Sequence, residues 1–86
     1  MPWKFIKMFN YIATFYTHYG AIKFYNTCIK NNVTAKQMPA PRVLSASCGT
    51  CVAFEAPTAD IFAYAEDAEA CYLCDADGYT KLTSAD

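Results

Sequence analysis

The chain has 86 residues, of which 55% are hydrophobic and 16% aromatic, and its formal net charge is −1. This length makes one domain, residues 1–86, and so apolar a composition argues against intrinsic disorder. Polar residues interrupt the apolar runs before they reach the length of a membrane span, so no membrane segment is expected. We read no signal peptide, because no hydrophobic core with a cleavage site follows the first lysines, and we expect a cytoplasmic protein.

The charges are divided unevenly along the chain. Residues 1–42 hold six basic residues and no acidic one, whereas residues 43–86 hold eight acidic residues and one lysine. The simplest interpretation is that the two halves pack together and complement each other. The alternative is a basic face for an anionic partner, such as RNA or an acidic protein. We disfavour nucleic acid, because no repeat of aromatic and arginine residues marks an RNA-binding module.

Residues 1–9 form an aromatic and basic lead-in that contains Trp3, Phe5 and Phe9. These aromatic residues do not recur at a spacing that would place them together on the inner face of a strand or helix. Burying all of them within the core would take an unusually large share of a small surface. We therefore expect the lead-in to pack on a second copy of the chain in a symmetric homodimer.

The next segments predict a strand followed by a helix. Residues 10–16 are rich in β-forming residues and predict the first strand. Thr17 is a suitable N-cap for a helix over 18–31, whose apolar residues recur at helical spacing. Asn31 and Asn32 can end this helix in a left-handed turn.

Two further strands are predicted around the centre of the chain. Residues 33–38 favour the first of them, which Pro39 ends, and residues 51–56 favour the other. The intervening loop contains a second proline, Pro41, and a Cys48-Gly49 pair. Glycine lets the backbone turn there and keeps bulk away from the sulfur.

The remaining residues predict a second helix and a last strand. Helical spacing of apolar residues predicts a helix over 58–73, which would bury one face. A turn over 75–78 and a short strand over 79–82 follow. The order β-α-β-β-α-β predicts an α+β fold of the ferredoxin-like, split βαβ kind. In this fold a small antiparallel sheet of four strands carries both helices on one face.

Four of the five cysteines form the pattern C-x2-C-x19-C-x2-C. This spacing is compatible with a tetrahedral zinc site made by Cys48, Cys51, Cys71 and Cys74. Neither pair is followed by the glycine-rich turn that is usual at such sites, however. Acidic residues around the second pair would also add like charge to a zinc tetrathiolate, whose net charge is about −2. A zinc- or iron-binding module is therefore an alternative and not our leading interpretation.

The five thiols differ in their expected reactivity. Cys28 and Cys71 fall on the buried faces of the two predicted helices and should be inert core residues. Cys48 lies close to Arg42, with Lys36 on the preceding strand, and cations favour the thiolate. We therefore expect Cys48 to be partly exposed, on the same side as Arg42, and the most reactive thiol. The only histidine, His18, is interpreted as a solvated helix cap or, alternatively, as a base near this thiol.

The Cys48-Gly-Thr-Cys51 pair also permits a thiol–disulfide oxidoreductase. In a thioredoxin-like site the first cysteine lies at the start of a helix, where its thiolate is stabilised. Here the following residues, Val-Ala-Phe-Glu-Ala, predict a strand. The oxidoreductase is kept as a second alternative.

The run from Pro39 to Gly49, with Tyr11–Phe15 and Ala21, resembles the family of small Se/S carrier protein-like domains. The hallmark of that family is Pro-x-Pro-Arg, then a serine, then Cys-Gly before a hydrophobic strand. The resemblance extends from residue 11 to about residue 83. It implies a compact α+β domain that carries sulfur or selenium on its cysteine. The residues that match the hallmark are Pro41, Arg42, Ser45, Cys48 and Gly49.

The chain departs from the family pattern after this motif. Thr50 and Cys51 stand where a leucine and a small or apolar residue are usual, and Cys71 and Cys74 have no counterpart that we recognise. We expect a carrier that holds a persulfide or perselenide on Cys48 and exchanges it with donor and acceptor proteins. Arg42 would stabilise its thiolate. Ser45 and Ser47 would donate hydrogen bonds to the loop or the sulfur, and Gly49, in the same binding site, would leave the sulfur uncrowded.

Cys51 is expected to resolve the persulfide. It would form a disulfide with Cys48 and release the terminal sulfur as sulfide. The sequence presents no second catalytic group for independent turnover, so an accessory carrier is expected in preference to an enzyme. No cofactor is expected, apart from the zinc of the alternative interpretation.

Overall fold

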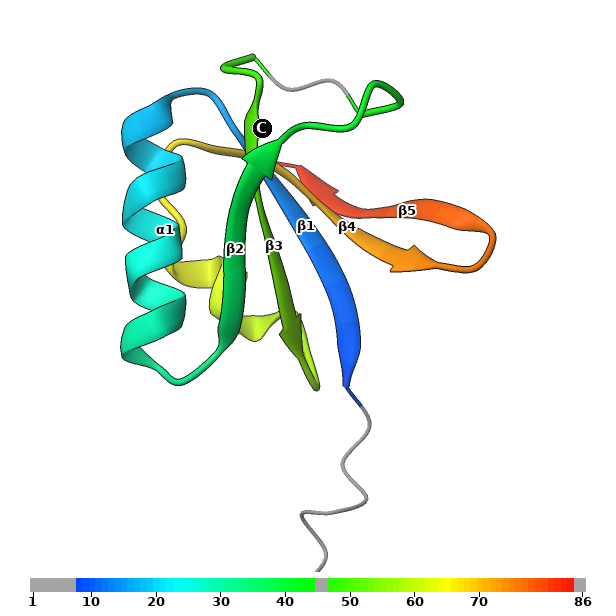
Figure 1. Ribbon diagram of the computed structural model, residues 1–86, viewed down its shortest axis with the longest axis horizontal. Coiled ribbons are helices and arrows are strands. Elements are labelled where there is room, and N and C mark those ends of the chain that lie inside the picture. Colours follow the sequence, from blue (N-terminus) through cyan, green and yellow to red (C-terminus); the bar gives the residue numbers. More distant parts are fainter. Residues whose placement is uncertain (1–7, 45–46, 85–86) are drawn as a thin grey trace, which may run out of the picture.

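The computed structural model describes residues 8–44 and 47–84, and in these residues it has five strands, one α-helix and one 3₁₀ helix (Figure 1). The strands form one antiparallel sheet in the order β2-β3-β1-β4-β5. The helix lies along one face of this sheet. In chain order the elements are β1 (Phe9–Phe15), α1 (His18–Lys30), β2 (Thr34–Pro39), β3 (Thr50–Ala56), η2 (Asp60–Tyr64), β4 (Ala68–Asp75) and β5 (Gly78–Ser84).

The α+β class is confirmed, but the described residues form one α-helix and five strands, and so do not clearly match the predicted ferredoxin-like arrangement of two helices and four strands. The segment predicted as a helix over 58–73 instead forms the short 3₁₀ helix η2 and the strand β4. Asp67 has φ 58, in the left-handed region, so a continuous right-handed helix cannot pass through it. Pairing with β1 then gives the backbone of β4 the hydrogen bonds that a helix would have supplied.

β1 is the central strand, and it is buried on both faces from Tyr11 to Phe15. Its odd-numbered residues point toward α1 and enter the main core cluster. Ile12 and Thr14 point the other way, toward the face that we call the open face. On that face Ile12 packs with Leu44 and Cys51 in a smaller cluster. The sheet therefore has side chains packed on both sides of its centre.

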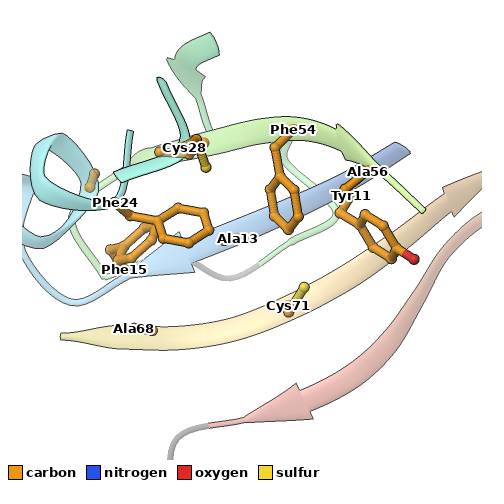
Figure 2. Packing of buried hydrophobic residues seen from close by; sticks show 11 residues of the cluster. Tyr11, Ala13, Phe15, Phe24, Cys28, Phe54, Ala56, Ala68 and Cys71 are labelled. Atoms are coloured by element: carbon orange, nitrogen blue, oxygen red, sulfur yellow. The ribbon is translucent and has the colours of Figure 1, made fainter. Parts of the chain in front are cut away.

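The core between α1 and the sheet is built on aromatic rings around Phe24 (Figure 2). The Phe24 ring lies 5.5 Å from that of Phe15 on β1 and 5.3 Å from that of Phe54 on β3. It also meets Phe62 of η2 edge-on, with the ring centroids 6.2 Å apart. Such tilted and edge-to-face contacts are favourable for aromatic pairs. One helical side chain thus joins α1 to two strands and to η2.

Both predicted ends of α1 are confirmed. The hydroxyl oxygen of Thr17 accepts a hydrogen bond of 3.0 Å from the backbone N–H of Gly20, as an N-cap does. At the other end Asn32 has φ 61, which is the left-handed conformation that commonly follows a helix.

The first turn of α1 lies against residues 66–67. A Cβ added at Gly20 would lie 2.6 Å from the carbonyl oxygen of Glu66 and 2.8 Å from the Cβ of Asp67. The backbone N–H of Tyr16 donates to the carbonyl oxygen of Asp67 at 2.8 Å, and the Thr17 hydroxyl donates to its carboxylate at 3.0 Å. This contact fixes where β4 begins.

Most of the predicted N-terminal lead-in, including Trp3 and Phe5, falls outside the described residues. Phe9 belongs to β1, where it is half-buried, packs against the core cluster and lies near the ring of Tyr11. In the described residues, 8–44 and 47–84, the one α-helix, α1, is too short to cross a membrane.

Replacing Phe24 with alanine should lower the free energy of unfolding by about 3–5 kcal/mol, because the ring is only 1% exposed and its contacts would be lost to a cavity. Ile22 lies on the same helix but is 47% exposed, so Ile22→Ala is the matched control and should change the free energy by less than about 0.5 kcal/mol. Urea unfolding followed by circular dichroism measures both. Equal losses in the two variants would contradict this packing.

Candidate functional site

The predicted reactive cysteine lies in the connection between β2 and β3, residues 40–49. The base of this connection is closed by a hydrogen bond of 2.9 Å from the Ala40 N–H to the Gly49 carbonyl oxygen. Gly49 has φ 75, a conformation that strongly favours glycine, and no atom lies within 4 Å of where its Cβ would be. The predicted backbone role of Gly49 thus agrees with its conformation. Leu44 is buried and anchors the connection to the open face.

Cys48 is partly exposed and packs against the edge of the main core cluster. Its Sγ lies 3.5 Å from the carbonyl oxygen of Thr50, to which the thiol donates a weak hydrogen bond. The residue lies at the end of the sheet where α1 and β4 begin and where β1 ends (Figure 1). These three elements therefore lie at the same end of the sheet as the thiol that the sequence predicts to be reactive.

Side chains from other elements bond to the residues on both sides of Cys48. The Glu69 carboxylate accepts two hydrogen bonds from Ser47, one from the backbone N–H at 2.9 Å and one from the hydroxyl at 3.2 Å. Two residues after the thiol, the Thr50 hydroxyl oxygen lies 3.0 Å from Nδ1 of His18, at the start of α1. We call residues 47–50 the Cys48 segment.

Glu69 points at this segment because β4 is irregular there. Residues 14 and 15 of β1 are consecutive, yet their partners on β4 are Ala70 and Ala68, so Glu69 is an extra residue in the strand. Both alanines are buried, whereas the Glu69 side chain reaches Ser47. A bulge commonly re-aims one side chain in this way, often beside a functional site.

The other four thiols are shielded to different degrees. Cys28, Cys51 and Cys71 are fully buried, and burial raises the pKa of the first two to about 11 and that of Cys71 to about 12. Cys74 is half-buried, and burial together with the charge of Asp75 raises its pKa. The predictions that Cys28 and Cys71 are buried are confirmed, although Cys71 is on a strand and not on a helix.

The structure does not bring the four paired cysteines together. Cys51 pairs with Thr14 and Cys71 with Ala13, and these neighbouring residues of β1 point to opposite faces of the sheet. Among the described residues, which include all five cysteines, no group of three or more potential ligands could hold a metal ion. The C-x2-C spacing therefore does not produce a tetrathiolate site in this fold.

The Cys48–Cys51 pair is also divided between two environments. Cys48 packs on the α1 side of the sheet, whereas Cys51 belongs to the cluster on the open face. The Cys51 thiol lies 3.8 Å from the carbonyl oxygen of Pro39, and both thiols are free. The two thiols therefore belong to different packing clusters, although they interact electrostatically.

The remaining predicted site residues are spread along the connection. Arg42 is exposed and makes no hydrogen bond or ion pair with the part of the chain that the structure describes, and Ser45 lies outside that part. Ser47 bonds to Glu69 and not to the sulfur. Sequence reasoning missed Glu69, because nothing in the local pattern separates it from the other acidic residues nearby. It also gave no role to Thr50, the residue that links His18 to the Cys48 segment.

Alkylation of the folded protein at pH 8 should modify Cys48 first and Cys74 next. The thiolate is the reacting species, and a thiol with a pKa of about 11 is ionised in only about one molecule in a thousand at this pH. Cys28, Cys51 and Cys71 should therefore react only after unfolding. Mass spectrometry of isotope-labelled alkylated peptides gives the order, and denatured protein is the control, in which the five rates should converge. Slower labelling of Cys48 than of Cys71 would refute the assignment.

The comparisons with known proteins bear on the same residues. A sequence model of the family described as "Putative Se/S carrier protein-like" matches residues 10–70. This region runs from β1 into β4, so it contains the Cys48 segment together with His18 and Glu69, whereas Cys71 and Cys74 lie beyond it. No curated protein and no solved structure gives a significant match. The chain belongs to the Putative Se/S carrier protein-like family.

Proposed function

We propose that this protein carries sulfur or selenium as a persulfide or perselenide on Cys48 and passes it between a donor and an acceptor protein. The observation that carries the proposal is the placement of Cys48, a partly exposed thiol on a held segment at the end of the sheet. Membership of the carrier-like family supports the same class of function.

The partial exposure of Cys48 supports a carrier that exchanges sulfur with other proteins. Two surface hollows, of about 270 and 400 Å³, are lined by residues of the sheet and by Val43 and Leu44, and neither includes Cys48. A thiol near the surface can be approached by a cysteine of another protein, whereas a small substrate needs a concave site.

Loading is a thiol exchange in which atoms and electrons balance. The Cys48 thiolate attacks the terminal sulfur of a donor persulfide, R–S–SH. A bond forms between Sγ and that sulfur, the S–S bond of the donor breaks, and the donor leaves as the thiolate R–S⁻. The hydrogen stays on the transferred sulfur, and the product is Cys48–S–SH. Exposed Arg42 would stabilise the thiolate and the incoming anion.

Unloading has two routes, and the position of Cys51 bears on the choice between them. In the predicted route Cys51 attacks Sγ of Cys48, forms a disulfide and expels HS⁻, after which an external dithiol must reduce the disulfide. Cys51 is fully buried, and burial raises its pKa to about 11, so it is a poor nucleophile in the folded chain. We therefore propose that an acceptor thiolate attacks the terminal sulfur directly, which yields the acceptor persulfide and regenerates the Cys48 thiolate.

Incubation with a low-molecular-weight persulfide, followed by alkylation and peptide mass spectrometry, tests loading. The peptide that contains Cys48 should gain the mass of one sulfur atom, and Cys48→Ser should abolish this gain. Cys74→Ser is the matched control, because Cys74 is the other partly exposed thiol, and it should load normally. Loading at Cys74 and not at Cys48 would refute the proposed carrier site.

Cys51→Ser distinguishes the two unloading routes in the same assay. A loaded Cys51→Ser protein should still pass its sulfur to an added thiol at the wild-type rate, because the acceptor attacks the terminal sulfur. Loss of transfer in this variant, together with a Cys48–Cys51 disulfide in the wild type, would show instead that Cys51 resolves the persulfide.

A further inference from the structure

The Glu69 carboxylate of β4 holds the Cys48 segment from outside the connection. Both of its hydrogen bonds are made to Ser47, the residue before the thiol. Hydrogen bonds to a charged acceptor are stronger than those between neutral groups. A backbone N–H bonded to a carboxylate also fixes the main chain itself, and not only a side chain.

The segment that carries Glu69 is itself held in place. Asp67 accepts from the backbone N–H of Tyr16 and from the hydroxyl of Thr17, and Glu66 forms an ion pair with Lys23 on α1. The bulge at Glu69 then aims its side chain away from the ladder and toward Ser47. Residues 66–69 therefore connect the start of α1 to the Cys48 segment.

The thiol held in this way is in a withdrawn position. Cys48 packs against the core cluster, and its S–H donates to the carbonyl oxygen of Thr50. A thiolate has no hydrogen to donate, and its charge would face the partial negative charge of that oxygen. Attack on a donor persulfide therefore requires Sγ to move off Thr50. This displacement of Sγ would move the Cys48 segment. The hydrogen bonds between Ser47 and Glu69 oppose that movement.

We propose that Glu69 is a positioning residue that keeps Cys48 withdrawn until a partner protein engages the Cys48 segment. The proposal rests on the carrier function proposed above, in which Cys48 exchanges sulfur with donor and acceptor proteins. Release of Ser47 from Glu69 frees the segment and lets Sγ turn outward. The ionisable groups that face this segment in the described residues are Glu69 at Ser47, His18 at Thr50 and Cys51, which interacts electrostatically with Cys48.

Glu69 can act on Cys48 in two ways: it can hold the Cys48 segment in position, or its negative charge can disfavour the thiolate directly. The two effects change different features of the pH profile of alkylation. A positional effect changes the limiting rate of alkylation at high pH, when the thiol is fully ionised, whether or not the midpoint also moves. A charge effect moves the pH midpoint of the profile and leaves the limiting rate unchanged. Glu69→Gln removes the charge but retains an amide oxygen that can accept from the Ser47 N–H.

The test is the pH profile of Cys48 alkylation by iodoacetamide in Glu69→Ala, Glu69→Gln and Glu66→Ala. Glu66→Ala is the matched control, since it removes a carboxylate from the same acidic segment but one that contacts Lys23 and not Ser47. Glu69→Ala should raise the limiting rate by about tenfold, the size of one hydrogen bond to a charged group. Glu69→Gln should raise it much less, and Glu66→Ala should leave it unchanged.

Three results would overturn the proposal: an unchanged limiting rate in Glu69→Ala, an equal rise in Glu66→Ala, or a shifted midpoint alone. If Glu69→Ala does not fold, Ser47→Ala gives the same test with a smaller rise, because only the hydroxyl contact is lost. Alkylation needs no persulfide, so the outcome is separate from the carrier function. Failure of Cys48 to accept sulfur would refute the function, while the alkylation profiles would still decide the role of Glu69.

Discussion

The close contact between the first turn of α1 and residues 66–67 determines both the fold around the site and the site itself. At Gly20 there is no room for a Cβ, because the carbonyl oxygen of Glu66 would lie 2.6 Å from it. The hydrogen bonds from Tyr16 and Thr17 to Asp67 complete the contact. Where the chain leaves this contact it enters β4 beside β1, and the bulge there presents Glu69 to Ser47. The close packing at Gly20 is thus connected, through residues 66–69 and Ser47, to the position of Cys48.

Much of the fold could be predicted where the signal is local. Thr17 is a side-chain cap, and Asn32 tolerates the left-handed conformation, so both ends of α1 follow from residue chemistry. The strands before and after α1 are rich in β-forming residues and end near the predicted positions. The turn at Gly49 was predicted for the same reason, since the freedom of a glycine in a loop is a local property, whereas Cys48 was predicted from the cations near it in the sequence and from the family motif.

The rest depends on contacts between residues far apart in the sequence. Residues 58–73 contain alanines and apolar residues at helical spacing, and only the pairing of β4 with β1 decides against a helix. The same pairing places Cys51 and Cys71 on opposite faces, which C-x2-C spacing does not reveal. Glu69 was missed because its role arises from a bulge, and a bulge is defined by the partner strand as much as by its own sequence.

Hydrogen exchange of the Ser47 backbone amide, followed by NMR, tests most directly the central claim that Glu69 holds the Cys48 segment. In the wild type this amide should exchange well below its free-peptide rate, because it donates to Glu69. The protection should disappear in Glu69→Ala and persist in Glu66→Ala. A Ser47 amide that exchanges at the free-peptide rate in the wild type would contradict the account.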